Sequence, residues 1–242
     1  MRAAFYTGAS GLVAYQDSMD VIGNNIANCS TTGYKAQRTA FSQLLATKMN
    51  EEANPVLVGN GVRTVSAGID ASAADVMATQ GSLDLAIAGN GWFCVSNGGQ
   101  KEYTRDGSFS LSMSGNSAYL VNQNGAYVLD SSGRQVTATV DSKSNNVDIG
   151  TIINNVGVFT FTNPEALTPA SSNSYLSNAY TGTATVAKKN EYTVLKGYLE
   201  QSDVSLADEM VALITAQRGY QLSARVVQTA DEVEQTINSL RR

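Results

Sequence analysis

The chain of 242 residues contains no histidine and is unusually poor in charged residues. Without histidine it lacks the commonest general base and the most frequent transition-metal ligand. Charged residues make up 15% of the chain, where soluble domains average about 25%. A surface with so little charge repulsion suits packing against copies of itself. The net charge of −5, with no local cluster of Lys or Arg, argues against a nucleic-acid partner.

Cysteine is scarce too, and long apolar runs are missing. Cys29 and Cys94 lie far apart without metal-ligand spacing, so unpaired thiols are expected rather than a disulfide framework or a zinc site. No apolar run reaches membrane-spanning length, so no membrane insertion is expected. The first residues also lack the apolar stretch and cleavage site of a secretory signal. The protein is therefore expected to be cytoplasmic, or exported by a route that reads no cleavable signal.

The hydrophobic periodicity changes twice along the chain and predicts an α+β fold. N- and C-terminal helices are expected to form a coiled-coil-like helical domain from residues 1–50 and 197–242. Residues 51–80 are expected to be a linker or extended segment. Residues 81–196 are expected to form a central antiparallel all-β domain.

The N-terminal segment repeats apolar residues every seven positions. A helix over residues 3–27 would align them in a narrow stripe, the a/d seam of a coiled coil. The stripe consists of Phe5, Leu12, Tyr15, Met19, Ile22 and Ile26. Gly8 and Gly11 within it either allow close approach to a neighbouring backbone or mark a frayed first turn. Asn28 is expected to end this helix in the left-handed conformation.

The C-terminal segment shows apolar spacings of four and three over its whole length. A helix over residues 206–240 would be about 52 Å long at 1.5 Å per residue. A stripe this narrow on a helix this long favours a coiled coil, with a core-facing helix of a globular domain as the alternative. Ser205 and Asp208 resemble a capping box, and Arg241 and Arg242 suit the end of a helix. The stripe includes Leu206, Met210, Leu213, Gln217, Tyr220, Ala224 and Val227, then Val226, Ala230, Val233, Ile237 and Leu240.

Between these ends, short apolar segments alternate with turn sequences such as Asn97-Gly98-Gly99 and Asn124-Gly125. This regular spacing predicts short antiparallel strands. The expected strands lie in residues 83–88, 92–95, 108–111, 118–121, 127–129, 136–140 and 156–161, with turns also at Ser114-Gly115, Ser132-Gly133 and Asn145-Asn146. Residues 162–195 are expected to form a long loop or weak edge strands.

Motifs that would carry chemistry are missing. Residues 59–61 and 89–91 both read Gly-Asn-Gly and begin like dinucleotide fingerprints, but neither opens a helical pattern, so both are interpreted as turns. Pairs of aspartates such as Asp84 and Asp106 are interpreted as solvated loop charges rather than catalytic carboxylates. No catalytic residue, metal site or cofactor is therefore predicted.

Three separated segments closely resemble the flagellar rod and hook protein family. They are Met19 to Lys35 near the N-terminus, Leu83 to Val95 followed by Tyr103 to Phe109 in the middle, and Gly197 to Val204 followed by Met210 to Tyr220. Within them, the residues that match the family motifs are Asn24, Asn25, Asn28, Gly33, Gln217 and Arg218. The family typically has a small apolar residue where this chain has Cys29, and Ala where it has Gly219.

The resemblance implies a structural subunit of the flagellar basal body that is not an enzyme. Such proteins leave the cell through the flagellar type III export apparatus without a cleaved signal. They polymerise helically into a tube that transmits torque, with the terminal helices lining its inside and the β domain outside. The implied partners are copies of the chain and other axial proteins, namely rod and hook subunits.

The length of the chain favours a distal-type rod subunit within this family. Hook subunits usually carry an additional outer domain, and the small proximal rod subunits lack a β domain. A short hook subunit is the first alternative. A secreted β-domain adhesin or binding protein with helical stalks is the second, and a hydrolase with paired carboxylates ranks last.

Overall fold

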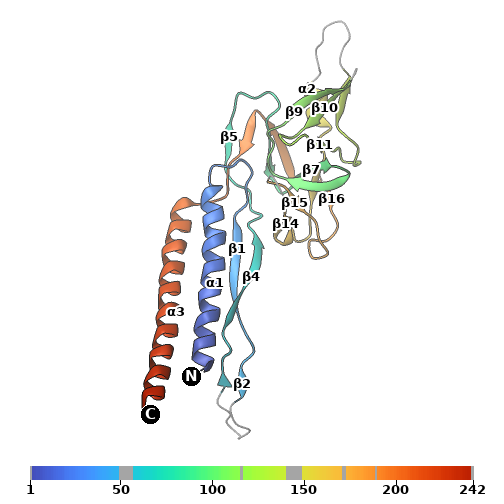
Figure 1. The fold of residues 1–242 in the computed structure, drawn as a ribbon. Coiled ribbons are helices and arrows are strands. Elements are labelled where there is room, and N and C mark those ends of the chain that lie inside the picture. The colour runs from blue at the N-terminus through green and yellow to red at the C-terminus, as the bar shows by residue number, and fades with distance from the viewer. Residues whose placement is uncertain are drawn as a thin grey trace. The chain divides into compact units, whose positions relative to one another are not determined.

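The computed structural model describes residues 2–48, 57–114, 117–139, 149–170, 173–188 and 190–240. Its two long helices lie at the two ends of the chain, with antiparallel strands between them (Figure 1). This confirms the predicted fold class. The helices are α1 (Arg2–Ala27), α2 (Ile149–Asn154) and α3 (Leu206–Leu240), with a short 3-10 helix, η1 (Pro164–Ala166).

The chain folds as two compact units. The helical unit comprises residues 1–27, 37–67 and 205–242, and the β unit comprises residues 28–36 and 68–204. The segment directly after α1 thus belongs to the β unit. Strands in residues 57–78, within the interval expected to be a linker, belong to both units.

In the helical unit, α1 and α3 lie side by side and run in opposite directions (Figure 1). Helix α3 has the bounds predicted from the apolar periodicity, and α1 begins one residue earlier than predicted. A β ribbon also lies along α1, where Ser18 bonds with Thr39 and Thr64 donates to the carbonyl of Ala14. The ribbon pairs β1 (Gln37–Gln43) with β4 (Val62–Ile69) and β2 (Thr47–Lys48) with β3 (Leu57–Val58).

The prediction that Asn28 ends α1 in a left-handed conformation is wrong. Among the described non-glycine residues only Asn173 has a positive φ. The chain instead leaves α1 through a turn in which the Thr31 amide donates to the Asn28 carbonyl over 3.0 Å. This turn ends α1 without a left-handed residue. The left-handed conformation comes later, at Gly33, with a φ of 63°.

The β unit is built around one large antiparallel sheet. Its main path runs in the order β12, β10, β11, β7, β8, β15, β14, with β9 beside β10, and β13 between β7 and β16. Two smaller pairs, β17 with β6 and β18 with β5, complete the unit. The bounds are β5 (Val76–Ala78), β6 (Leu85–Gly89), β7 (Trp92–Asn97), β8 (Gln100–Thr104), β9 (Ser110–Ser114), β10 (Ser117–Val121), β11 (Tyr127–Val128), β12 (Thr137–Thr139), β13 (Val158–Thr160), β14 (Thr168–Pro169), β15 (Tyr175–Leu176), β16 (Thr185–Val186), β17 (Tyr192–Lys196) and β18 (Tyr198–Glu200).

Strand β7 explains the continuous apolar run that begins at Trp92. Phe93 and Val95 point into one apolar core, while Trp92 and Cys94 point into a second core on the opposite face. A strand covered on both faces needs apolar residues at every position rather than at every second one. The Trp92 ring packs edge-on against Tyr175 with centroids 5.2 Å apart.

The predicted strands all appear, but the periodicity missed several elements. Strand β8 has a polar sequence and forms because it pairs along its length with β7. Strand β17 lies in the interval expected to be loop and weak edges, yet it pairs over five residues with β6. Helix α2 was not predicted either. The expected turns at Gly115 and Asn145-Asn146, the strand end at Val140, and Arg241 and Arg242 lie outside the described residues.

Among the described helices, none combines the length and apolarity that crossing a membrane requires.

Candidate functional site

Small residues allow α1 and α3 to pack closely. A Cβ atom added to Gly8 would lie 2.9 Å from Val227 Cγ2, and one added to Gly11 would lie 3.0 Å from Ser223 Oγ. A Cβ at Gly219 would overlap the ring of Tyr15. Of the two interpretations of the α1 glycines, the close approach is therefore confirmed. Helix α3 continues through Gly219 without a break, and the missing side chain makes room for an aromatic ring.

The face of α3 that meets α1 lies one residue away from the predicted apolar stripe. The facing residues include Glu209, Ala216, Gly219 and Ser223. One step along an α-helix is a rotation of about 100°. The first part of the predicted stripe, which starts with Leu206 and Met210, is therefore turned away from α1, and the pair closes there on small residues. Further along, the stripe meets α1, where Val227 packs against Gly8.

As a result, most large apolar residues of α3 stay exposed. Ala216 is the only buried residue of α3 over its described length, while Met210 is 50% and Leu240 81% exposed. Among the residues predicted as an interface, Leu213 and Val227 are half-buried, and Leu206, Met210, Gln217, Tyr220, Val233, Ile237 and Leu240 are exposed. On α1, Ile22 is buried, Leu12, Tyr15, Met19 and Ile26 are half-buried, and Phe5 is exposed.

Asn25 clasps the three elements of the helical unit together. It is 1% exposed, and its Nδ2 donates to the carbonyl of Gln37 and to Glu209 Oε1, both over 2.9 Å. Its Oδ1 accepts from the Gln37 amide over 3.0 Å. One side chain thus ties α1 to the start of β1 and to the first turn of α3. The sequence marked Asn25 only as a motif residue and did not identify Gln37 or Glu209.

A groove of about 430 Å³ lies between β1 and α3, with α1 as its floor. Tyr15 and Phe41 lie at one end with their rings tilted and their centroids 5.3 Å apart, and Asn25 also lines the groove. The groove is mainly apolar, lined by residues of α1 such as Val21 and by Ala212 and Ala216 of α3. The periodicity could not reveal it, because β1 lies beside α1 only in the folded unit.

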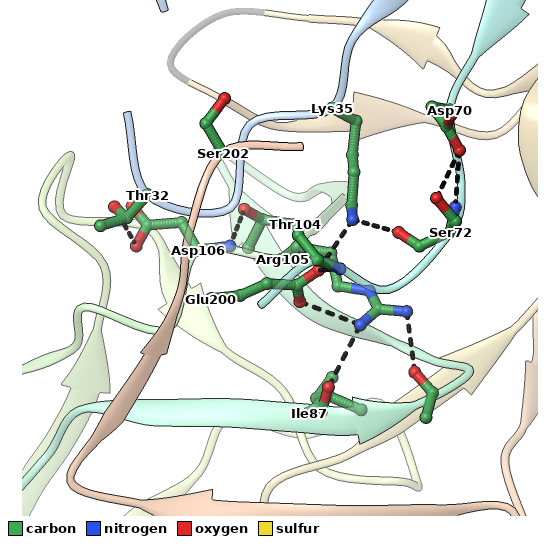
Figure 2. Close-up of polar contacts among 12 residues, drawn as sticks. Thr32, Lys35, Asp70, Ser72, Ile87, Thr104, Arg105, Asp106, Glu200 and Ser202 are labelled. Carbon is green, nitrogen blue, oxygen red and sulfur yellow. Dashed lines mark hydrogen bonds and ion pairs between the residues drawn. The ribbon is translucent and has the colours of Figure 1, made fainter. Parts of the chain in front are cut away.

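In the β unit, a buried charge cluster joins Lys35, Arg105 and Glu200 (Figure 2). Lys35 Nζ lies 2.7 Å from Glu200 Oε1, and Arg105 NH1 lies 3.0 Å from Glu200 Oε2. Arg105 also donates to the carbonyls of Ile87 and Gly89 and stacks over the Trp92 ring. The three side chains are at most 1% exposed. Buried charges of this kind persist because each is paired and hydrogen-bonded.

The motif residue Gly33 fits the segment after α1 into the β unit. Its amide donates to the Glu200 carbonyl over 2.8 Å, and an added Cβ would overlap the backbone of Arg105 and Asp106. The Lys35 amide donates to the Tyr175 hydroxyl over 3.1 Å. The other motif residues are placed differently: Asn24 and Arg218 are exposed and Asn28 is half-buried.

Nothing in the described part of the chain resembles a metal site. The described residues contain no group of three or more Cys, Asp or Glu side chains placed to hold an ion. Both cysteines are free. Burial raises the pKa of the Cys94 thiol to about 11, and this outweighs the lowering effects of Lys101 and of a hydrogen bond with Tyr103.

Three protein-family models match the chain. "Flagella basal body rod protein" matches residues 5–35, "Flagellar hook protein FlgE/F/G D1 domain" residues 86–161, and "Flagellar basal body rod FlgEFG protein C-terminal" residues 195–240. The first match covers most of α1, the second covers the large sheet from β7 to β13, and the third covers all of α3.

Curated relatives match over almost their full length. The flagellar basal-body rod protein FlgG of Bacillus subtilis (strain 168) is 31% identical, with 100% of each chain covered. FlgG of Caulobacter vibrioides is 33% identical, with 98% of this chain and 99% of the relative covered. The flagellar hook-basal body complex protein FlhP of Bacillus subtilis is 31% identical, again with 100% of each chain covered.

Proposed function

The chain belongs to the flagellar basal-body rod protein family, and we propose that it polymerises there through the exposed faces of α1 and α3. It is a structural subunit of the flagellar rod, of the distal type, and it lies in the basal body. Membership also places it in assembly with other axial components of the flagellum. The hook-subunit and adhesin alternatives are not favoured.

The observation that carries the polymerisation proposal is the mismatch between the two faces of α3. The face that packs on α1 is made of small residues, and the large apolar residues beside it remain in solvent. Burying one such side chain stabilises a contact by about 1.5–3 kcal/mol. Monomeric proteins seldom leave an apolar stripe this long uncovered, and its presence marks a protein–protein interface.

We propose that the stripe on α3 of one copy packs against the exposed residues on α1 of the next, a contact that is heterologous because the two surfaces differ. Contacts of that kind continue from copy to copy and build a helical filament when they do not close into a ring. We propose that torque passes along the rod through these helix–helix contacts. The terminal helices then line a tube and carry this load.

Export through the flagellar type III apparatus, without a cleaved signal, is part of the same proposal. Two free cysteines impose no crosslink on an unfolded chain in transit. Mass spectrometry of the subunit from purified basal bodies should find the N-terminal peptide from Arg2 or Met1 intact. A subunit that starts further along the chain would contradict uncleaved export.

We propose further that the chain has no catalytic role. Its relatives carry names of structural rod proteins. The candidate carboxylates act in the structure as turn and network residues: Asp106 Oδ1 accepts from the hydroxyls of Thr32 and Ser108. Asp84 accepts from the Thr79 hydroxyl over 2.5 Å.

A single charge on the stripe tests the polymerisation proposal. Ile237 is 47% exposed, so Ile237→Asp should leave the unfolding free energy of the monomer unchanged. It should raise the concentration needed for polymerisation about ten- to a hundredfold, because one buried aliphatic contact is lost. Sedimentation of purified protein measures the polymerisation threshold, and urea unfolding measures the stability of the monomer.

Asn238→Asp is the matched control, since it adds the same charge at the neighbouring exposed position. Equal polymerisation of the two variants would show that the stripe is not an interface.

A further inference from the structure

The sequence contains four Asn-Gly steps, at residues 60–61, 90–91, 97–98 and 124–125. An Asn-Gly step loses ammonia without an enzyme more readily than other steps, because glycine has no Cβ to shield its amide nitrogen from the asparagine side chain. The reaction needs an asparagine side chain that is free to turn and a glycine amide that is free to attack it. The fold decides which of the four steps meets both conditions.

At the first step, the asparagine side chain is held. Asn60 Nδ2 donates to the carbonyl of Leu45 over 2.6 Å and to the hydroxyl of Thr47 over 2.9 Å. The glycine is enclosed as well, since a Cβ added to Gly61 would overlap Ser10 Oγ. Attack at this step would break two hydrogen bonds in the helical unit.

At the second and fourth steps, the glycine is restrained. Gly91 is buried, and an added Cβ would lie 2.3 Å from Val158 Cγ1. The Gly125 amide donates to the Asn122 carbonyl over 3.0 Å. A glycine that is packed or hydrogen-bonded in this way must leave its place before its nitrogen reaches the neighbouring side chain.

The third step lies at the tip of the hairpin that joins β7 to β8. Asn97 and Gln100 are the last paired residues of the two strands, and Gly98 and Gly99 form the turn between them with φ of 57° and 92°. All four residues are exposed. No described residue accepts a hydrogen bond from the Gly98 amide, and a Cβ added to Gly98 or Gly99 would meet nothing within 4 Å.

The side chain of Asn97 is held only weakly. Its Nδ2 lies 3.4 Å from Glu102 Oε1, which is longer than the usual distance of about 3.0 Å for such a bond. The Glu102 carboxylate is itself fixed by the Ser174 hydroxyl, which donates to its other oxygen. The amide of Asn97 is therefore free to turn toward the backbone of the next residue.

We propose that Asn97 is a deamidation site of the folded protein. The Gly98 amide nitrogen gives up its proton to hydroxide and forms a bond with the side-chain carbonyl carbon of Asn97. The bond from that carbon to Nδ2 breaks, and Nδ2 takes up a proton from water and leaves as ammonia. Water then opens the cyclic succinimide at either carbonyl, which leaves an aspartate or an isoaspartate at position 97.

The product places two carboxylates next to each other at the end of the hairpin. The new side chain no longer has an N–H group to donate to Glu102, and Glu102 is only 9% exposed. Like charges at this distance repel each other more strongly where water screens them less. Deamidation should therefore weaken the pairing of β7 with β8.

Site-resolved mass spectrometry tests the inference. The full chain is incubated at mildly alkaline pH below its polymerisation threshold, digested at intervals, and the deamidated fraction is measured at each of the four steps. In folded protein, position 97 should react several times faster than positions 60, 90 and 124. In urea, where the fold no longer restrains them, the four steps should react at similar rates. A rate at position 97 no higher than at the other positions of the folded chain would overturn the inference.

A pair of turn variants tests which amide attacks. Gly98→Asp should slow the reaction of Asn97 several-fold, because a side chain then shields the attacking nitrogen, and aspartate tolerates the positive φ of this turn. Gly99→Asp is the matched control, since it adds the same charge to the same turn and leaves Gly98 in place. Equal slowing by the two variants would contradict attack by the Gly98 amide.

The effect of the product is measured with Asn97→Asp. This variant should unfold at a lower urea concentration than the unmodified chain, as followed by the fluorescence of Trp92. Asn124→Asp is its control, because Asn124 is also exposed in a hairpin turn and should leave the midpoint unchanged. Equal midpoints for the two variants would show that deamidation does not weaken the hairpin.

Discussion

At the scale of single residues, polar side chains join the separate parts of each unit. Asn25 satisfies both backbone groups of Gln37 and also binds Glu209. In the β unit, buried ion pairs join separate segments in the same way, between Glu200 and both Lys35 and Arg105. The bonds of Asn25 with Glu209 and of Lys35 and Arg105 with Glu200 join residues far apart in the sequence, so each of them closes a long loop. Their loss should therefore cost more than a surface pair does.

Lys35→Met should destabilise the β unit by about 3 kcal/mol, because Glu200 loses one of its two cationic partners while it stays buried. Urea unfolding followed by the fluorescence of Trp92, the single tryptophan, measures the change. Arg134→Ala is the control: Arg134 pairs with Asp130 but is 79% exposed, and such a pair contributes less than about 1 kcal/mol. Similar losses for the two variants would show that burial does not strengthen the cluster.

Asn25→Ala should cost the helical unit about 1–3 kcal/mol, since the buried backbone groups of Gln37 lose their partner. The helical signal in circular dichroism, followed during urea unfolding, measures the loss. Gln16→Ala on the exposed face of α1 should change stability by less than about 0.5 kcal/mol. An equally small effect at Asn25 would mean that the clasp is dispensable.

Cys94 should be unreactive toward thiol reagents in the folded protein at pH 8. Its thiol is 1% exposed, and burial raises its pKa to about 11, so little of the reactive thiolate forms. A titration should count one thiol, Cys29, in native protein and two in denaturant. Two reactive thiols in native protein would contradict a closed second core.

The same pKa gives a stability change at alkaline pH. The unfolded thiol ionises near pH 8.5, while the folded thiol stays protonated until about pH 11. The stability that the buried thiol contributes is therefore fully present below about pH 8.5 and is lost as the pH rises toward 11. Cys94→Ala should abolish this part of the alkaline decline in a pH series of urea unfolding.

At the scale of the elements, α1 and α3 interlock through an aromatic ring over a glycine. Tyr15 occupies the space where a side chain at position 219 would be. Two opposite effects are therefore expected for Gly219→Ala: a gain of about 1 kcal/mol in helix propensity and the displacement of the Tyr15 ring. The balance depends on whether the ring is present.

A double-mutant cycle separates the two effects. Gly219→Ala should stabilise the helical unit by up to about 1 kcal/mol in a Tyr15→Ala background, and should give no gain when Tyr15 is present. Urea unfolding of the four variants measures the coupling. Additive effects would show that the ring does not use the space above Gly219.

At the scale of the whole molecule, the two units differ in where their apolar residues lie. The β unit contains both apolar cores and the single tryptophan, which is 2% exposed. The helical unit holds the exposed apolar residues of α3. Folding and assembly should therefore be separable by truncation.

A chain that ends at Val204 should keep its β unit folded and fail to polymerise. The emission maximum of Trp92 should match that of the full chain, because all residues that surround it lie before Val204. Sedimentation should find no polymer at any accessible concentration. Normal assembly of this variant would refute the role of α3, and a solvent-exposed Trp92 would show that the β unit depends on the helices.

Much of the architecture follows from local patterns in the sequence. The bounds of α1 and α3 are set by apolar residues that recur with the helical period, and the positions of most strands follow from alternation and turn chemistry. The three family motifs indicate what kind of protein this is. These are properties of short segments, so they can be read before the chain is folded.

The faces that the elements present to each other were decided only by the tertiary structure. Over the first half of α3, the pair closes one residue away from the predicted apolar stripe, on Ala216, Gly219 and Ser223. Small side chains let two helices come closer than large ones do, and no count of apolar residues reveals that preference.

The long-range polar contacts could not be predicted from the sequence either. The pairing of Lys35 with Glu200 and of Asn25 with Glu209 joins residues far apart in sequence, and no local pattern links them. Strand β8 and the groove beside β1 likewise exist only because of the elements that lie next to them. The sequence by itself determined the two long helices, most of the strands and the kind of protein. The packing of α1 against α3 then determined which apolar residues remain exposed.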